Sequence, residues 1–292
     1  MESLDAFLRV EMDVLQYAAF FGALMLLSAV ELVADRSQRA PQRIRRWPPN
    51  FGLTMFNIMI LGAIPVSGVL AADYARDNGI GLLNNFPVAP ALVLVLGFLL
   101  RSFVSWMTHL AMHKVPLLWR VHRVHHTDTF LDVSTTVRFH PIEFLISTPI
   151  LIAVIVASGI SPVVLMLYEV FDAAMAVFTH SNIRLPRSVD RALRLVLVTP
   201  DMHRVHHSSS QPETDSNYGA TLSIWDYLFR TYRDKSPEEL GTMQLGLTEC
   251  QDDRALSFRW LLMLPFRALN IQNTQDLVPP SSRLAVNKGE RQ

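Results

Sequence analysis

The ten histidines of this 292-residue chain stand in repeated spacings that suit metal binding. All of them lie between His109 and His207. Eight belong to groups spaced by three or four residues, positions that share one face of an α-helix. The groups are His109 and His113; His122, His125 and His126; and His203, His206 and His207. Neutral imidazole is the commonest protein ligand for metals and suits iron, zinc and copper. The spacing therefore predicts three metal-binding groups.

The number of histidines predicts more than one metal ion. Eight imidazoles from three helical segments exceed what one four-coordinate or octahedral ion can bind, so we expect two ions in a shared site. His180 ends an apolar segment that returns to the same side of the membrane, and we predict that it is a further ligand. The histidines alone do not separate iron from zinc.

Several other polar side chains are candidates to bind the metals or to orient the imidazoles through hydrogen bonds. An ionisable group within a membrane segment is costly unless it faces a bundle interior or a polar cavity, and Glu169 and Asp172 are in that position. Arg101 is the expected ion-pair partner of either. The full set of further ligands or orienting residues is His140, Asp128, Asp201, Glu169, Asp172 and Asn217. Asp132 and Asp226 are candidates for orienting residues only. For the aspartates near the histidine groups, the alternative role is helix capping or loop solvation.

The elements that must position these residues are long apolar helices. Half of the residues are hydrophobic and 18% are charged, against roughly a quarter charged in soluble proteins. Residues 17–34, 51–72 and 88–107 are each near the length that crosses a hydrocarbon layer of about 30 Å. Residues 144–157 and 163–177 predict a helical hairpin that crosses the bilayer or dips into it. Core helices of a soluble all-α protein are the alternative, which three separate long runs disfavour.

The arginines predict which way the helices cross the membrane. Five lie between the first two apolar runs, whereas one lies before the first run and one between the second and third. The five are Arg36, Arg39, Arg43, Arg45 and Arg46, and the two others are Arg9 and Arg76. This asymmetry places the histidine groups on the cytoplasmic side of a bacterial inner membrane or of the endoplasmic reticulum. The predicted fold is an all-α, multi-pass integral membrane helical bundle with a cytoplasmic histidine-box domain.

The remaining composition excludes some classes and suggests domain limits. Twenty-six basic and 26 acidic residues cancel, so no global field would gather nucleic acid. A single cysteine, Cys250, excludes an internal disulfide framework and a cysteine-based zinc ribbon. We predict N-terminal transmembrane helices with a basic loop (1–94), a histidine-box domain (95–233) and a C-terminal cytoplasmic or interfacial tail (234–292). Residues 255–269 are either an interfacial helix or a helix packed on the histidine domain, and the last twenty residues form a polar, mobile tail.

The order of the histidine boxes and of the short motifs around them resembles the pattern of the fatty acid hydroxylase superfamily, which includes the sterol desaturases. An HxxxH box is followed by an HxxHH box and, about 80 residues on, by a second HxxHH box. The flanking motifs are PLLWR at 116–120, RFHPIE at 138–143, THSN at 179–182, TPDMHR at 199–204, NYG at 217–219 and IWDYLF at 224–229. Leu110 and Ser102 stand where many bacterial relatives have Arg and Asp, which bears on the position of the first-box helix or on substrate preference.

The resemblance implies a membrane-bound di-iron oxidoreductase that uses O₂ to hydroxylate or desaturate a lipid C–H bond, in a fatty acyl chain, a sterol or a related lipid. The implied cofactors are two iron ions, with O₂ as co-substrate. Electrons would come from a separate ferredoxin- or cytochrome b5-like protein and its reductase. A zinc-binding membrane scaffold or regulator with the same histidine cage and no redox activity is the alternative. A metal transporter would need ligands at mid-membrane, whereas these boxes follow the apolar runs.

Overall fold

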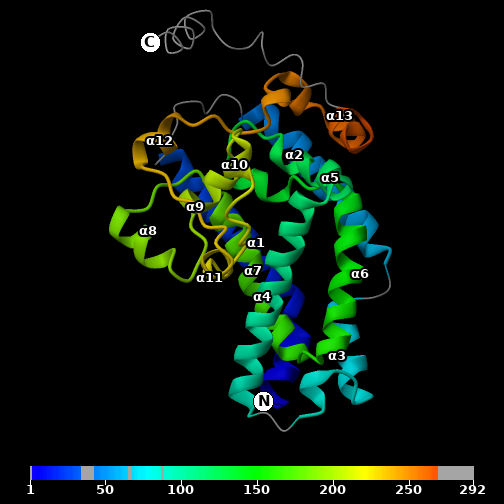
Figure 1. The fold of residues 1–292 in the computed structure, drawn as a ribbon. Helices are drawn as coiled ribbons and strands as arrows, with labels where there is room; N and C mark the ends of the chain where they lie inside the picture. Colours follow the sequence, from blue (N-terminus) through cyan, green and yellow to red (C-terminus); the bar gives the residue numbers. More distant parts are fainter. Residues whose placement is uncertain (1, 34–42, 65–66, 87–88, 269–292) are drawn as a thin grey trace, which may run out of the picture.

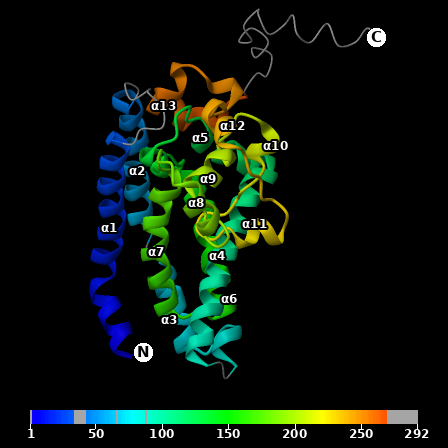
Figure 2. The ribbon, with the colours of Figure 1, turned by 90° about the vertical axis from the view of Figure 1, so that its left-hand side faces the viewer.

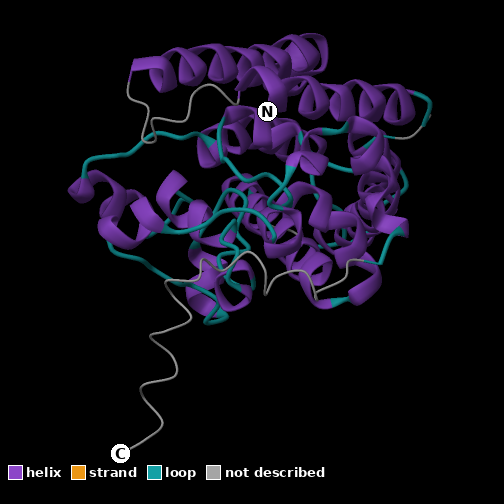
Figure 3. Cartoon of the chain, turned by 90° about the horizontal axis from the view of Figure 1, so that it is seen from above, coloured by secondary structure: helices purple, strands orange, loops and turns teal. Residues whose placement is uncertain are grey.

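The computed structural model describes residues 2–33, 43–64, 67–86 and 89–268. Within these ranges the chain forms helices joined by loops and turns, and no strand (Figure 3). The long helices are α1 (Glu2–Val33), α2 (Arg43–Gly62), α4 (Pro90–Lys114), α6 (Pro141–Ser158) and α7 (Pro162–His180). Of these, α1, α4, α6 and α7 are long and apolar enough to cross a membrane. The predicted all-α membrane bundle is therefore confirmed.

The long helices run side by side, and seven of the short helices in the described residues form a cap at the end opposite the N-terminus (Figures 1 and 2). Helices α1, α4 and α7 run toward the cap, whereas α2 and α6 run away from it (Figure 1). As a result, three helix C-termini and two helix N-termini meet at the cap. The short helices of the cap are α5 (Pro116–His126), α8 (Arg187–Leu193), α9 (Pro200–His206), α10 (Gln211–Thr214), α11 (Ile224–Leu228), α12 (Pro237–Thr242) and α13 (Phe258–Met263).

The apolar run 51–72 is not one helix, so the prediction of a single span there is wrong. Helix α2 ends at Gly62, and α3 (Gly68–Asp77) begins six residues later. Ser67 caps α3 by accepting a hydrogen bond from the backbone N–H of Leu70, 3.2 Å away. The sequence between the helices contains Pro65, and proline lacks the backbone N–H that helical hydrogen bonding uses. The hydropathy of this run concealed residues that stop one helix and start another.

The helical hairpin predicted over 144–177 is present as α6 and α7. Gly159 ends α6 with φ of 68°, the left-handed conformation that glycine adopts without a steric cost. The 18 residues of α6 and the 19 of α7 are each long enough to cross a membrane. This hairpin brings His180, the last residue of α7, back to the cap.

A buried ion-pair network ties the start of α2 to the loop after α5. The Arg46 guanidinium is fully buried and donates to Asp128 at 2.6 and 2.8 Å and to Asp132 at 2.8 Å. Burial alone would raise the pKa of Asp128, but Arg46 and Arg138 outweigh it and hold that pKa at about 2. Arg43 likewise pairs with a buried carboxylate of α1 at 2.8 Å. Two arginines of the predicted basic loop therefore serve the packing of the cap, while Arg36 and Arg39 lie outside the described residues.

The C-terminal helical segment packs on the histidine domain. Trp260, Leu261 and Leu264 are buried in one cluster with Leu53 of α2 and Val124 of α5. Of the two predicted roles for residues 255–269, packing on the histidine domain is the one that the described part, up to 268, adopts. Figure 1 shows α13 at the end of the molecule farthest from the N-terminus. The predicted mobile tail, the last twenty residues, lies outside the described residues, and the three domain limits stay a prediction.

Candidate metal centre

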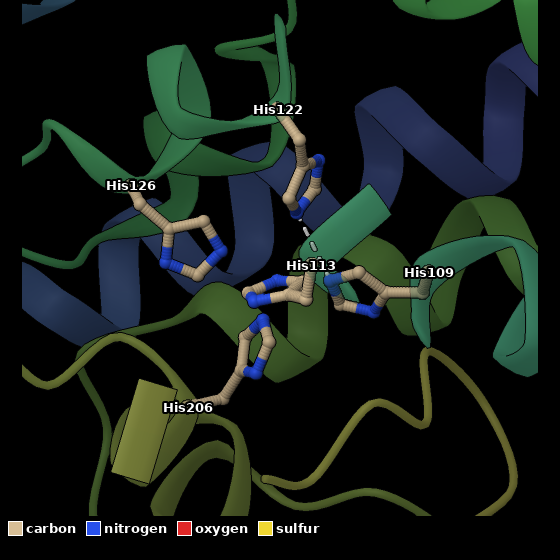
Figure 4. A group of neighbouring side chains, drawn as sticks. All are labelled: His109, His113, His122, His126 and His206. Atoms are coloured by element: carbon tan, nitrogen blue, oxygen red, sulfur yellow. Dashed lines mark hydrogen bonds between the residues drawn. The ribbon is translucent and has the colours of Figure 1, made fainter. Parts of the chain in front are cut away.

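Nine of the ten histidines gather into two neighbouring groups in the cap. In each group the imidazole nitrogens that could bind metal all lie within 4.8 Å of one another. The five-histidine group contains His109, His113, His122, His126 and His206, and the four-histidine group contains His125, His180, His203 and His207. Figure 4 shows the rings of the five-histidine group pointing toward a common centre. The two groups adjoin, because the rings of His126 and His207 lie 4.7 Å apart between centroids.

Each HxxHH box divides its histidines between the two groups. On α5, His122 and His126 enter the five-histidine group and His125 enters the four-histidine group. The box on α9 is arranged the other way, since His206 alone enters the five-histidine group. Residues four apart lie on nearly the same side of a helix, and the residue between them points about 60° away from one of them. Two short helices and His207, the residue that follows α9, therefore supply six imidazoles to two centres.

Hydrogen bonds to backbone carbonyls fix which nitrogen faces inward in three of the rings, those of His109, His180 and His206. The Nδ1 of His109 donates to the carbonyl of Tyr218 at 2.7 Å. His206 donates from Nδ1 to the Ser216 carbonyl at 2.7 Å, and His180 donates in the same way to the carbonyl of Ala176 at 2.8 Å. A carbonyl oxygen only accepts, so the proton of each neutral ring is on Nδ1. The Nε2 lone pair of each ring is then free to bind metal.

The inward-facing nitrogens approach one another too closely for neutral rings without a cation. His122 donates from Nδ1 to the Glu143 carboxylate at 2.9 Å. Its Nε2 lies 3.1 Å from Nε2 of His109, the contact dashed in Figure 4. Both of these nitrogens carry lone pairs, so no hydrogen bond joins them. Two nitrogens held by one ion at about 2.0–2.1 Å lie about 3 Å apart, which matches the observed spacing.

The same spacing recurs in the four-histidine group. The Nε2 of His180 lies 3.2 Å from that of His125 and 3.0 Å from that of His203, and His207 and His203 are 3.2 Å apart between Nε2 atoms. In the neighbouring group, Nε2 of His206 is buried without a hydrogen-bond partner. Burial without such a partner is costly for a polar atom, and a metal ion would relieve that cost. The residues present therefore fit two metal ions.

Burial keeps the imidazoles in the neutral form that binds metal. Burial and the neighbouring imidazoles lower the pKa of His125, His126, His203 and His207 well below the ordinary value. For His206, burial lowers the pKa to about 3. Because these rings are neutral at neutral pH, metal binding there need not displace a proton from the inward nitrogen.

Among the described residues, Glu143 is the one acidic side chain that hydrogen-bonds to a histidine of either group within 3 Å; its partner is His122. Glu143 was not among the candidate site residues predicted from the sequence. It lies in the first turn of α6, three residues after His140. The sequence does contain a signal that could have identified this residue, since Glu143 ends the RFHPIE motif between the second histidine box and an apolar helix. Carboxylates that receive a hydrogen bond from a metal-bound imidazole fix its orientation and raise its basicity.

His140 belongs to neither group. Its Nδ1 accepts a hydrogen bond from the N–H of Ile142 and so caps α6, with an N–N distance of 3.2 Å. Its Nε2 donates to the Leu262 carbonyl at 3.1 Å. Both ring nitrogens are thus engaged with backbone, and the structure does not bring His140 to the metal centre as either a ligand or an orienting group.

The predicted aspartates of the boxes act mainly on the protein scaffold. Asp128 and Asp132 accept from Arg46, as described above. Asp226 accepts from the N–H groups of Tyr218 and Gly219 at 2.9 and 2.8 Å. It thereby holds the turn whose Tyr218 carbonyl orients His109, one step removed from the ring itself.

Asn217 likewise acts through backbone. It adopts φ of 52°, and its side-chain N–H₂ group donates to the carbonyls of Met202 and Arg233 at 2.9 Å each. It follows Ser216, whose carbonyl accepts from His206, so Asn217 fixes the loop that orients that ring. Asp201 lies in the first turn of α9 and faces a separate pocket beside α8, away from both histidine groups.

A cavity of about 420 Å³ runs from both histidine groups down between α4, α6 and α7. At one end it reaches His109, His122, His125, His180 and His203. Its walls include the apolar side chains of Val104, Met112, Phe139, Phe144 and Leu151. Glu169 and Asp172 line it farther from the histidines, and Glu169 pairs with Arg101 at 3.0 Å, as the sequence suggested. The only cysteine, Cys250, is buried in the α2–α5–α13 cluster and lines no part of the cavity.

Comparison with known proteins identifies the family of the histidine domain. Residues 94–231 match the family model described as fatty acid hydroxylase. The chain is 31% identical over 202 residues to "Ornithine lipid hydroxylase OlsE" of Rhizobium tropici, a match that covers 67% of this chain and 59% of the relative. No solved structure matches the chain.

Two further relatives are similar over about half and about two thirds of the chain. Human "Alkylglycerol monooxygenase" is 30% identical over 137 residues, or 46% of this chain and 29% of that protein. The "Very-long-chain aldehyde decarbonylase GL1-5" of Oryza sativa subsp. indica is 27% identical over 208 residues, or 68% of this chain and 31% of that protein. The chain therefore spans between about three tenths and three fifths of the length of these curated relatives.

Proposed function

Because the chain belongs to the fatty acid hydroxylase family over residues 94–231, we propose that it is a membrane-bound di-iron oxidoreductase that uses O₂ to hydroxylate or desaturate a lipid C–H bond. The observation that carries the proposal is the pair of adjoining groups in which imidazole Nε2 atoms lie 3.0–3.2 Å from one another. Relatives named as a lipid hydroxylase and as a monooxygenase support the reaction class.

Nine histidines would hold the two ions. Imidazole sites without thiolate suit iron, and iron when bound supplies the O₂ and electron chemistry that no side chain can. His109, His113, His122, His126 and His206 would hold one ion, and His125, His180, His203 and His207 the other. Glu143 would fix the ring of His122, and the carbonyl of Tyr218 that of His109.

The cavity supplies binding and orientation. Its apolar walls suit a long hydrocarbon chain, and its upper end opens onto histidines of both groups. Phe139 stacks on His125 with 4.4 Å between ring centroids, so an aromatic face excludes water beside the four-histidine group. Binding in this cavity would hold one carbon of the lipid near the centre, which is the positioning that such a reaction requires.

The partners follow from this chemistry. The substrate is a membrane lipid, and the electrons come from a separate ferredoxin- or cytochrome b5-like protein and its reductase. A cap on the cytoplasmic side of a bacterial inner membrane or of the endoplasmic reticulum would let that donor reach the histidine domain. A zinc scaffold is not favoured, because a scaffold does not need a lipid-sized cavity that ends at the metal ligands.

The test combines metal analysis with lipid analysis. We expect protein purified in detergent from iron-supplemented cells to hold iron, and its expression to create an O₂-dependent lipid product detected by mass spectrometry. His125→Ala and His206→Ala should abolish the product while the protein still inserts in the membrane. Arg45→Ala, at an exposed ion pair with Asp253, is the matched control. Zinc in place of iron together with unchanged lipids would refute the enzyme and support the scaffold.

A further inference from the structure

The lower edge of the cap carries exposed apolar side chains that the proposed chemistry does not use. Two segments form this edge, residues 194–197 and α11 with the residue after it. Leu195 is 63% exposed and Leu228 is 66% exposed, and Val196, Tyr227 and Phe229 are exposed beside them. We call these five residues the cap edge. Exposed apolar groups gathered in this way mark a contact with a partner or a membrane.

The two segments of the cap edge are joined into one surface. The N–H of Val198 donates to the carbonyl of Thr221 at 3.0 Å, and the N–H of Ser223 donates to that of Val196 at 3.0 Å. The Ser223 hydroxyl also donates to the Arg194 carbonyl at 2.7 Å. Because these bonds tie residues 194–198 directly to the start of α11, the apolar side chains of both segments lie on one continuous edge.

The cap edge lies against a membrane-crossing helix at a depth that the bilayer should occupy. The indole N–H of Trp225 in α11 donates to Ser102 of α4 at 3.0 Å. The ring of Phe229 stacks on Trp106 of α4, 4.7 Å away between centroids. Figures 1 and 2 both show α11 beside α4. A hydrocarbon layer of about 30 Å that began at Pro90 would extend to about residue 110, so residues 102–106, about 18–24 Å along α4, would lie within it.

The exposed charges around the cap edge are mostly basic, and the exposed carboxylate beside it, Asp234, pairs with Arg194. Every exposed charged residue in 187–197 and in 224–233 is an arginine, whereas Asp190 and Asp226 are buried. The four exposed arginines are Arg187, Arg191, Arg230 and Arg233. An apolar edge with basic residues beside it is typical of elements that lie in a membrane interface and attract anionic headgroups.

We propose that the cap edge inserts into the lipid leaflet on the histidine side and that its four arginines bind anionic lipid headgroups. The leaflet then rises around α4 to the turn that carries His109, so both histidine groups lie where the hydrocarbon ends. A lipid can enter the cavity from the leaflet without crossing water. This membrane contact goes beyond the proposed reaction and does not depend on which metal the site holds.

Depth measurements with single cysteines test the insertion. In a Cys250→Ser background, Leu195→Cys and Leu228→Cys carry a nitroxide label in vesicles of phosphatidylcholine and phosphatidylglycerol. Collision of the label with O₂ relative to a water-soluble nickel chelate reports its depth. Leu94→Cys, exposed on α4, is the lipid reference, and Glu238→Cys, exposed on α12, is the aqueous reference. We expect both cap-edge labels to resemble the Leu94 label, and values like those of Glu238 would overturn the proposal.

A second measurement needs no substitution. The unmodified chain in vesicles with a photoactivatable phosphatidylcholine, whose diazirine lies in the upper acyl chain, should crosslink through residues 224–233 and not through 237–242. Replacing phosphatidylglycerol by phosphatidylcholine should lower the crosslinking yield, because the arginines lose their anionic partners. Absence of crosslinks in 187–197 and 224–233 would refute insertion, and a yield independent of phosphatidylglycerol would refute the headgroup contact. Neither readout requires turnover, so loss of the proposed reaction leaves this test unaffected.

Discussion

Glu143 offers the sharpest test of how the protein prepares its metal centre. Its carboxylate accepts the Nδ1 proton of His122 at 2.9 Å, and both side chains are buried, with residue exposures of 9% and 2%. In Glu143→Ala the Nδ1 group loses this acceptor, and the ring is free to turn its other nitrogen outward. Loss of such an outer partner lowers metal affinity by about 10–100-fold, which corresponds to about 1.4–2.8 kcal/mol.

The assay is competition with a chelator. Iron-loaded protein in detergent is titrated with chelator, and the chelator concentration that removes half of the bound iron is compared between variants. Glu143→Ala should release iron at a concentration about 10–100-fold lower than the unmodified protein. Ser147→Ala, one turn further along α6 in the same cavity, is the control and should bind iron normally. Circular dichroism checks that helix content is unchanged. Equal release from folded Glu143→Ala and from the control would show that the carboxylate does not hold the ring.

Three further predictions follow from the packing around the centre. Arg46→Met should lower the free energy of unfolding by about 3–5 kcal/mol because it leaves buried carboxylates unpaired. Arg45→Ala, at an ion pair in which more than half of each side chain is exposed, should lower it by at most about 1 kcal/mol. Thermal unfolding in detergent compares the two variants, and equal losses of stability would contradict the buried network. His140→Ala should keep its iron, since both ring nitrogens contact backbone, whereas His206→Ala should lose part of it, as measured by elemental analysis. Asp226→Asn should weaken iron binding less than Glu143→Ala does, because Asp226 acts on the five-histidine group only through the turn that carries Tyr218. A larger effect of Asp226→Asn in the same chelator titration would contradict that order.

The local part of the site could be predicted from the sequence because helical spacing is a local property. Positions three and four apart share a helix face whatever the helix packs against, so the grouping of His122 with His126 followed from the sequence alone. The division of each box between two groups did not, because it depends on how α5 and α9 cross. Glu143 was missed for the same reason: it reaches His122 only after the chain folds back over 21 residues.

The membrane helices were predicted less evenly. Hydropathy identified α4 and the α6–α7 hairpin, because these are long apolar runs, and the helix of α6 continues through Pro149. The prediction of a single span failed over 51–72, because average hydropathy does not distinguish residues that favour helix ends, here Gly62, Pro65 and Ser67, from other residues. The count of arginines between the apolar runs also assigned Arg46 to a loop, because its buried partners lie 82 and 86 residues further along the chain.

The division of each HxxHH box between the two groups has a consequence for how the centre assembles. Helix α5 cannot turn His122 and His126 toward one ion without also aiming His125 at the other, and α9 is bound by the same rule with the assignments reversed. An ion that settles in either group therefore orders both helices for its neighbour and removes part of the entropy that the second ion would have to overcome. The centre should fill as a pair, so a chain with a single ion would be scarce even when iron is limiting.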